Sequence, residues 1–139
     1  MNNTIQQMIF SFEEENDFYG SVSIEEIKNT EKVLGVSFPS KYISFIEKYG
    51  SGGICGVNIL GVEGDRGASV LATTENYRKL GLREDLIVLE DLGEFVMCSE
   101  TGSKEHIFYW DSVQKLESFR YQNFDDYLED TFREAISNW

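Results

Sequence analysis

The chain has 139 residues, of which 41% are hydrophobic and 14% aromatic, and its formal net charge is −13 at pH 7. This length suits one domain over residues 1–139, and the apolar content is too high for a disordered chain. The negative charge argues against direct nucleic-acid binding, because phosphate backbones would be repelled. No apolar run approaches the roughly 20 residues of a membrane span. The N-terminus has neither a basic start nor an apolar signal core, so we expect a cytoplasmic protein without membrane contact.

Composition leaves two interpretations of the charge open. The acids either keep the surface solvated, or they steer the protein toward a basic partner such as an enzyme that itself binds nucleic acid. The two cysteines, Cys55 and Cys98, are too few for a disulfide framework. We expect both to be buried free thiols, located in strands, in a reducing compartment.

Three helices are predicted in the first third of the chain. The first spans residues 4–15, with apolar side chains on one face. Ser23 and Glu26 form a capping box ahead of a second helix, which ends at Gly35. The third helix begins at Pro39, the only proline, and has apolar residues at positions 38, 42, 45, 46 and 49 before Gly50 ends it.

The middle of the chain is predicted to contain a strand, a loop and a helix. Residues 54–60 are apolar enough for a first strand after a glycine-rich hinge. Residues 61–67 include three glycines, but the acids Glu63 and Asp65 argue against a phosphate-binding loop. A weaker helix is expected over residues 68–80, ended by Gly81.

The last part of the chain is predicted to form strands followed by a helix. Strands are expected at residues 86–89, 95–98, 106–110 and 115–119, the last of these at a sheet edge because of its charges. Turns at 90–94 and 100–104 separate them, and Asn123 caps a final amphipathic helix. This order predicts an α+β fold with a mixed or mostly antiparallel sheet of about four to six strands, packed with N-terminal helices and a C-terminal helix.

No catalytic, cofactor or metal site is predicted. His106 is the only histidine, so a Cys98–His106 pair or a Ser-His-Asp triad would depend on it, and it lies among aromatic core positions. One histidine and two distant cysteines do not make a zinc site, and no calcium-binding loop is present. Paired carboxylates for acid–base catalysis stay open, because a sequence does not show whether side chains converge. We expect a protein that is not an enzyme.

Function is therefore expected to come from binding. Loops that join neighbouring strands meet at the rim of a sheet, so their acids are expected to form a dense negative patch. An aromatic side chain nearby would add rigid contact area. The candidate partner-binding residues are Glu63, Asp65, Glu90, Asp91, Glu94, Glu100, Asp111 and Trp110.

The region from about residue 22 to 136 resembles the SUKH superfamily. The similarity is carried by a helix with Glu31 and Leu34-Gly35, a proline turn at Phe38-Pro39, and a following helix that ends in glycines. Phe38 stands where a leucine is more usual. The matching positions are Ile27, Glu31, Leu34-Gly35, Phe38-Pro39, Tyr42-Ile43-Ser44-Phe45, Tyr49-Gly50, Gly52-Gly53, the strand at 86–91, Tyr109-Trp110-Asp111 and Phe124.

This resemblance implies a function. The superfamily includes fungal regulators of cell-wall synthesis and many bacterial immunity proteins that neutralise polymorphic toxins. It therefore implies an immunity protein, a monomer or weak homodimer, that occludes the basic active-site cleft of a cognate nuclease-type toxin. A non-enzymatic regulatory or scaffold module is the alternative.

Overall fold

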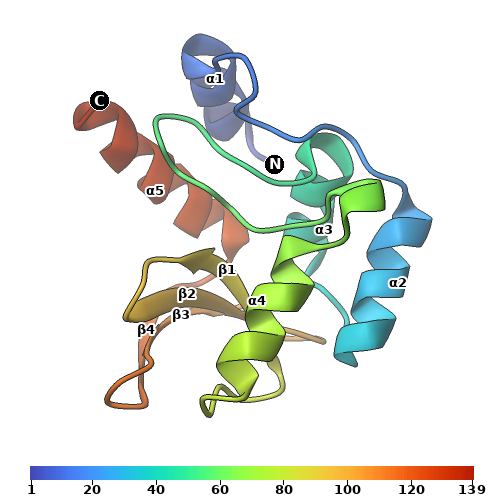
Figure 1. The fold of residues 1–139 in the computed structure, drawn as a ribbon. Helices are drawn as coiled ribbons and strands as arrows, with labels where there is room; N and C mark the ends of the chain where they lie inside the picture. The colour runs from blue at the N-terminus through green and yellow to red at the C-terminus, as the bar shows by residue number, and fades with distance from the viewer.

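Local sequence signals set the boundaries of the helices in the computed structural model, which describes residues 1–139 (Figure 1). The predicted capping box is confirmed: the Glu26 N–H donates to Ser23 Oγ at 3.2 Å, and the Ser23 N–H donates to Glu26 Oε1 at 3.2 Å. Gly35 ends the same helix in a left-handed conformation, with φ of 72°. The helices are α1 (Asn3–Phe12), α2 (Ile24–Leu34), α3 (Ser40–Tyr49), the short 3₁₀ helix η1 (Gly64–Arg66), α4 (Ser69–Arg78) and α5 (Phe124–Ser137).

The first helix is shorter than predicted and begins earlier. Its N-cap is Asn2, whose Oδ1 accepts the Ile5 N–H at 2.8 Å. It ends at Phe12 instead of Glu15, because the carboxylate of Asp17 accepts the Glu14 N–H at 2.8 Å and turns the chain.

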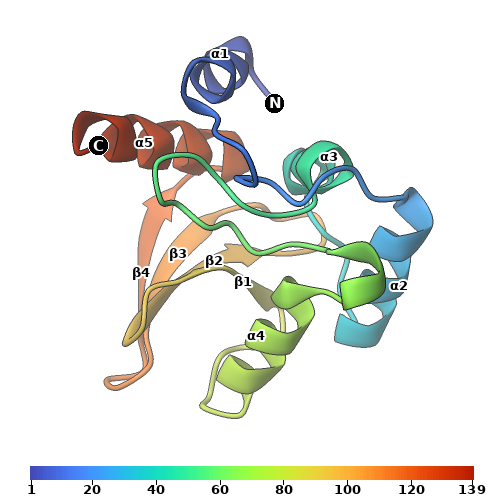
Figure 2. The ribbon, with the colours of Figure 1, turned by 45° about the horizontal axis from the view of Figure 1, so that its top comes forward.

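A four-stranded antiparallel sheet, with the strand order β1-β2-β3-β4, completes the fold and confirms the α+β prediction. The sheet lies between α4 on one face and α5 on the other, and α1 packs outside α5 (Figure 2). The strands are β1 (Leu86–Asp91), β2 (Phe95–Glu100), β3 (Ile107–Asp111) and β4 (Leu116–Tyr121).

Buried aromatic rings join α3 to α5 beside the sheet. The Phe124 ring at the start of α5 lies 5.3 Å from the ring of Tyr42 and 5.6 Å from that of Phe45, both on α3. The Tyr42 hydroxyl also donates to the Leu60 carbonyl at 2.6 Å, which holds the loop before α4 against the core. None of the helices combines the length and the apolar character that a bilayer crossing requires.

The strand predicted over residues 54–60 is wrong, although its apolar side chains Ile54 and Ile59 are buried. Cys55 and Gly56 have φ values of 52° and 85°, and two successive left-handed residues turn the chain out of an extended path. Only one isolated bridge joins this segment to Gly52. Cys55 therefore lies in a buried loop and not in a strand.

Candidate functional site

The structure brings four of the eight predicted partner-binding residues to one end of the sheet. Asp91 ends β1, Glu94 lies in the β1–β2 turn, and Asp111 ends β3 opposite Phe95 of β2. Glu90 lies one residue before the end of β1, in the strand and not in the predicted turn. The expected negative patch therefore exists at this end in part, and its role in partner binding stays a prediction.

Two of the eight residues are not at the surface, which corrects their placement on an exposed rim. Trp110 is 2% exposed and packs under α4, where the Tyr77 ring meets it edge-on at 6.1 Å. Glu100 is 7% exposed, lies at the opposite end of the sheet, and accepts the His106 N–H at 3.2 Å. Trp110 is covered by α4, and Glu100 is held by the segment that leads into β3 at His106.

Glu63 and Asp65 form a separate group, in the loop before α4. Glu63 accepts the Ser69 N–H at 2.7 Å and the Ser69 hydroxyl at 2.6 Å, so it stabilises the first turn of α4. Asp65 is exposed in η1. These two acids are therefore not continuous with the end of the sheet.

A hollow that the sequence did not predict lies between α5 and the β1–β2 hairpin. It has a volume of about 320 Å³. Glu90 lies in it half-buried, and accepts the Tyr127 hydroxyl at 2.6 Å. The lining residues are Glu90, Leu92, Met97, Tyr121, Tyr127, Thr131, Glu134, Ala135 and Asn138.

The ionisation of this hydrogen-bonded pair is perturbed. Burial raises the pKa of the Glu90 carboxyl, and the hydrogen bond from Tyr127 opposes that rise. Burial, followed by the nearby charge of Glu90, raises the pKa of Tyr127 well above its ordinary value. The proton therefore stays on the Tyr127 hydroxyl, and the Glu90 carboxylate accepts a hydrogen bond from it.

An aromatic sheet face continues from the hollow toward the end of the sheet. Met97 pairs with Tyr109 across β2 and β3, so their side chains share one face, and Phe95 shares it two residues away. The Phe95 and Tyr109 rings stack at 4.6 Å, and the Arg120 guanidinium lies 4.7 Å from the Tyr109 ring. Phe95 and Tyr109 are half-buried, and rigid rings that remain partly accessible are typical of protein-binding surfaces.

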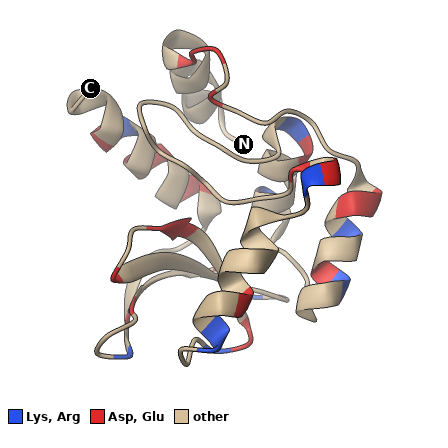
Figure 3. Cartoon of the chain, in the orientation of Figure 1, with Lys and Arg blue, Asp and Glu red and all other residues tan.

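Glu134 of α5 lines the same hollow, and Asp130 bonds to Tyr121, which also lines it; periodicity is the signal that would have found these acids. Asp126, Asp130 and Glu134 recur every four residues, which places them in one row on the helix. Figure 3 shows acids along α5 and at the β1–β2 end of the sheet on the same side of the molecule. We call the group Glu90, Leu92, Glu94, Tyr121, Asp130 and Glu134 the sheet–α5 surface.

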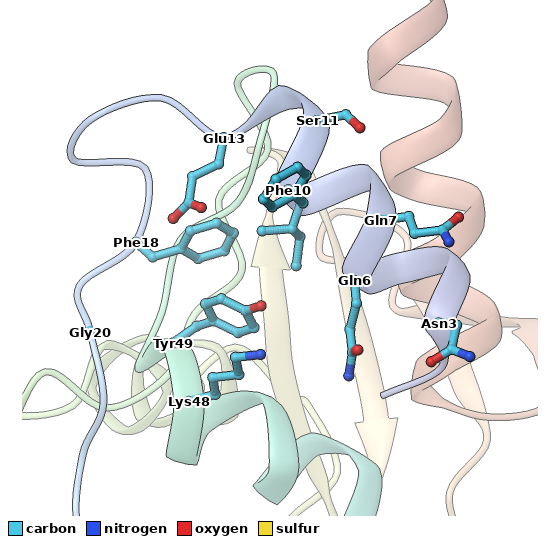
Figure 4. A pocket seen from close by; sticks show the side chains of 11 residues that line it. Asn3, Gln6, Gln7, Phe10, Ser11, Glu13, Phe18, Gly20, Lys48 and Tyr49 are labelled. Atoms are coloured by element: carbon cyan, nitrogen blue, oxygen red, sulfur yellow. The ribbon is translucent and has the colours of Figure 1, made fainter.

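A second and larger hollow of about 860 Å³ lies between α1, α3 and the segment that joins α1 to α2 (Figure 4). Phe10 of α1 is 88% exposed beside it, and the rings of Phe18 and Tyr49 pack at 4.5 Å on its other wall. The Lys48 ammonium lies 5.4 Å from the Tyr49 ring. The lining of this groove is mixed, since polar side chains such as Gln6, Gln7 and Glu13 accompany the aromatic rings.

Cys98 and His106, the two residues weighed for catalysis, lie in different environments. Cys98 is buried on β2, and burial raises the pKa of its thiol, which disfavours the nucleophilic thiolate. His106 is exposed, with its Nδ1 3.5 Å from Glu100 Oε1. No three of the His, Cys, Asp and Glu side chains are grouped so as to hold a metal ion.

Comparison with protein families gives one match. The model of a family described as SUKH_5: SMI1-KNR4 cell-wall matches residues 1–133. The match confirms the resemblance to the SUKH superfamily that was stated for about residues 22–136. The matched region also includes α1 and the loop after it, which precede residue 22.

Proposed function

The chain belongs to the SUKH_5 family, described as SMI1-KNR4 cell-wall, and from that premise we propose that it is an immunity protein, which binds a cognate protein toxin and neutralises it. Family membership carries this proposal, because the wider superfamily that the sequence resembles includes many bacterial immunity proteins. The protein would act in stoichiometric amounts by binding, without a reaction of its own. Two unpaired cysteines support a cytoplasmic setting.

We propose further that the toxin is of the nuclease type and that its basic cleft is covered by the sheet–α5 surface. The support is unbalanced charge: of 25 acids, only Asp85, Glu105, Glu117 and Glu129 lie within 4.0 Å of a Lys or Arg nitrogen. Carboxylates on an exposed face attract the cations that a nuclease uses to hold phosphate groups. Association would then be fast and strongly dependent on salt.

The placement of Glu134 on α5 supports a binding role over a structural one. Glu134 lies in the last turn of α5, which contains no basic residue, so its charge opposes the helix dipole. Asp130 and Glu134 are four residues apart, and like charges at that spacing destabilise a helix by about 0.2–0.5 kcal/mol. Glu134 therefore does not help α5 to fold, whereas Asp130 accepts a hydrogen bond from the Tyr121 hydroxyl at 2.6 Å. A basic partner would relieve the repulsion between the two acids.

Co-expression with the toxin encoded beside this gene tests the proposal. Cells that produce the toxin are expected to survive only when the protein is present. Replacing Glu94 and Glu134 by lysine is expected to slow association and reduce survival. The matched control replaces Glu75 of α4 and Glu84 of the α4–β1 loop, both exposed, which changes the net charge equally at a different place. Cell death despite abundant folded protein would refute the immunity role.

The alternative is a non-enzymatic regulatory or scaffold module, and the cell-wall description of the family favours it. In that case the protein would give no protection against the neighbouring toxin. It would instead be recovered from its own cells with a partner that has no toxic domain.

A further inference from the structure

The hollow between α5 and the β1–β2 hairpin has the features of a receptor for one cationic side chain. We propose that it binds an arginine side chain of the partner protein, with the Glu90 carboxylate as the group that pairs with the guanidinium. This inference rests on the proposed function for the identity of the partner. The chemistry of the hollow is argued from its own residues.

Glu90 is a carboxylate with unused capacity to accept hydrogen bonds. It is half-buried, and its one hydrogen bond comes from the Tyr127 hydroxyl to Oε1 at 2.6 Å. No Lys or Arg nitrogen lies within 4.0 Å of it, although an ionised carboxylate has about four acceptor positions. Acids withdrawn from water are normally paired with a cation, so Glu90 lacks a partner that the hollow has room to admit.

The chain has no cation of its own positioned to fill the hollow. Arg120, on the same sheet face, lies over the Tyr109 ring at 4.7 Å. Arg133 of α5 bonds to Glu129 Oε2 at 3.0 Å. Both guanidinium groups are therefore engaged elsewhere, and the negative charge of Glu90 and Glu134 is left for a group from outside.

The walls of the hollow suit arginine better than lysine. Tyr121 is half-buried and presents its ring to the hollow, while Tyr127, 1% exposed, packs edge-on against it with a centroid distance of 5.7 Å. Leu92 adds apolar surface for a side-chain stem. A guanidinium is flat, weakly hydrated, able to stack on an aromatic ring and able to bond a carboxylate through two N–H groups. An ammonium ion offers none of the stacking. The volume of about 320 Å³ is sufficient for one such side chain.

The hollow is preferred to the α1–α3 groove on the ground of charge. The groove has both a cation, Lys48, and an acid, Glu13, in its lining, with exposed Phe10 beside them, so its charges do not select one class of occupant. The sheet–α5 hollow combines a carboxylate, rings and an acidic edge, and this combination identifies one class of side chain. It is also continuous with the acids at the end of the sheet.

An NMR titration of the full chain tests the proposal with the side chain alone. The probe is N-acetyl-L-arginine methylamide at constant ionic strength, and the neutral control is N-acetyl-L-citrulline methylamide, which has nearly the same shape. The arginine compound is expected to shift the resonances of Met97, Tyr121 and Ala135 in a saturable way, and the citrulline compound is expected not to. Equal shifts from both compounds, or shifts confined to other surfaces, would overturn the proposal.

Variants locate the binding group. Glu90→Gln keeps an acceptor for the Tyr127 hydroxyl and is expected to weaken arginine binding about tenfold, in line with the loss of one charge-assisted bond. Glu134→Gln, at an exposed position that cannot unfold the core, is expected to weaken it about twofold, and Glu75→Gln to leave it unchanged. Unchanged binding in a folded Glu90→Gln protein would overturn the assignment, and so would unchanged binding in Glu134→Gln.

The two proposals fail separately. Saturable arginine binding without protection in the co-expression assay would refute the immunity role and leave the arginine receptor standing. Protection that Glu90→Gln leaves at full strength, together with no arginine binding, would refute the receptor and leave the immunity role standing.

Discussion

Two tyrosines that line the hollow beside Glu90 allow a controlled test of how Glu90 is held. Tyr127 donates to Glu90, and Tyr121 donates to Asp130, each at 2.6 Å. The first bond joins a buried hydroxyl to a half-buried carboxylate, and the second lies at the exposed surface. Replacing either tyrosine by phenylalanine removes one hydroxyl group and little else. The two variants therefore differ chiefly in whether the lost hydrogen bond was buried or exposed.

The expected cost follows from that difference. A hydrogen bond to a charged group is worth about 1.5–3 kcal/mol when it is withdrawn from water, whereas a hydrogen bond at the exposed surface is at the low end of the usual range, about 0.5 kcal/mol. Tyr127→Phe is therefore expected to lower the free energy of unfolding by about 2 kcal/mol, and Tyr121→Phe by about 0.5 kcal/mol. For a chain of this size the first corresponds to a fall in Tm of roughly 6–10 °C.

Urea denaturation followed by circular dichroism measures both values, and the m-value is expected to stay unchanged. The Tyr127→Phe penalty depends on an ionised Glu90, so it is expected to fade as the pH falls through the raised pKa of that group. In Glu90→Gln, the same tyrosine substitution is expected to cost less than in the original protein. Equal penalties for the two tyrosines would contradict the assignment of Glu90 to a desolvated site.

Three other predictions concern Glu90 itself and two positions elsewhere in the fold. Because the pKa of Glu90 is raised in the folded protein, folding favours the protonated form of this residue. The resulting stability is present below the ordinary pKa of glutamate and is lost as the pH rises through the raised value. Glu90→Gln, which does not titrate, is therefore expected to flatten this part of a stability–pH profile. Glu31→Ala removes a carboxylate that accepts the Phe38 N–H at 2.6 Å, and is expected to cost about 1.5–3 kcal/mol in urea denaturation. Gly61→Ala places a methyl group on the Gly50 carbonyl oxygen, and is expected to cost about 3 kcal/mol or more, seen as a lower Tm and poor recovery of folded protein.

Helices and strands were predictable where local chemistry decides them. The Ser23–Glu26 capping box, Gly35 and Asn123 each act within a few residues, and they lie where predicted. Residues 54–60 were not predictable, because an apolar run is compatible with a strand and with a buried loop. The bond from the Tyr42 hydroxyl to the Leu60 carbonyl, 18 residues apart, belongs to the tertiary structure and has no local signal.

The sequence predicted which kinds of residue form the candidate site, but not where each of them lies on the fold. Glu94 directly precedes β2 and Glu100 is its last residue, so acids close in sequence are far apart on the sheet. Trp110 was assigned to the surface because the sequence does not reveal that α4 covers it. The acids of α5 had a visible four-residue spacing, but their position beside Glu90 depends on how the helix crosses the sheet.

The most direct test of the central claim is a titration of toxin activity in vitro. Purified toxin encoded beside this gene is mixed with increasing amounts of the protein, and cleavage of nucleic acid is followed. Loss of all activity at one equivalent, with association that slows as salt rises and in the Glu94/Glu134 lysine variant, is the predicted result. Undiminished cleavage in the presence of excess folded protein would contradict the account.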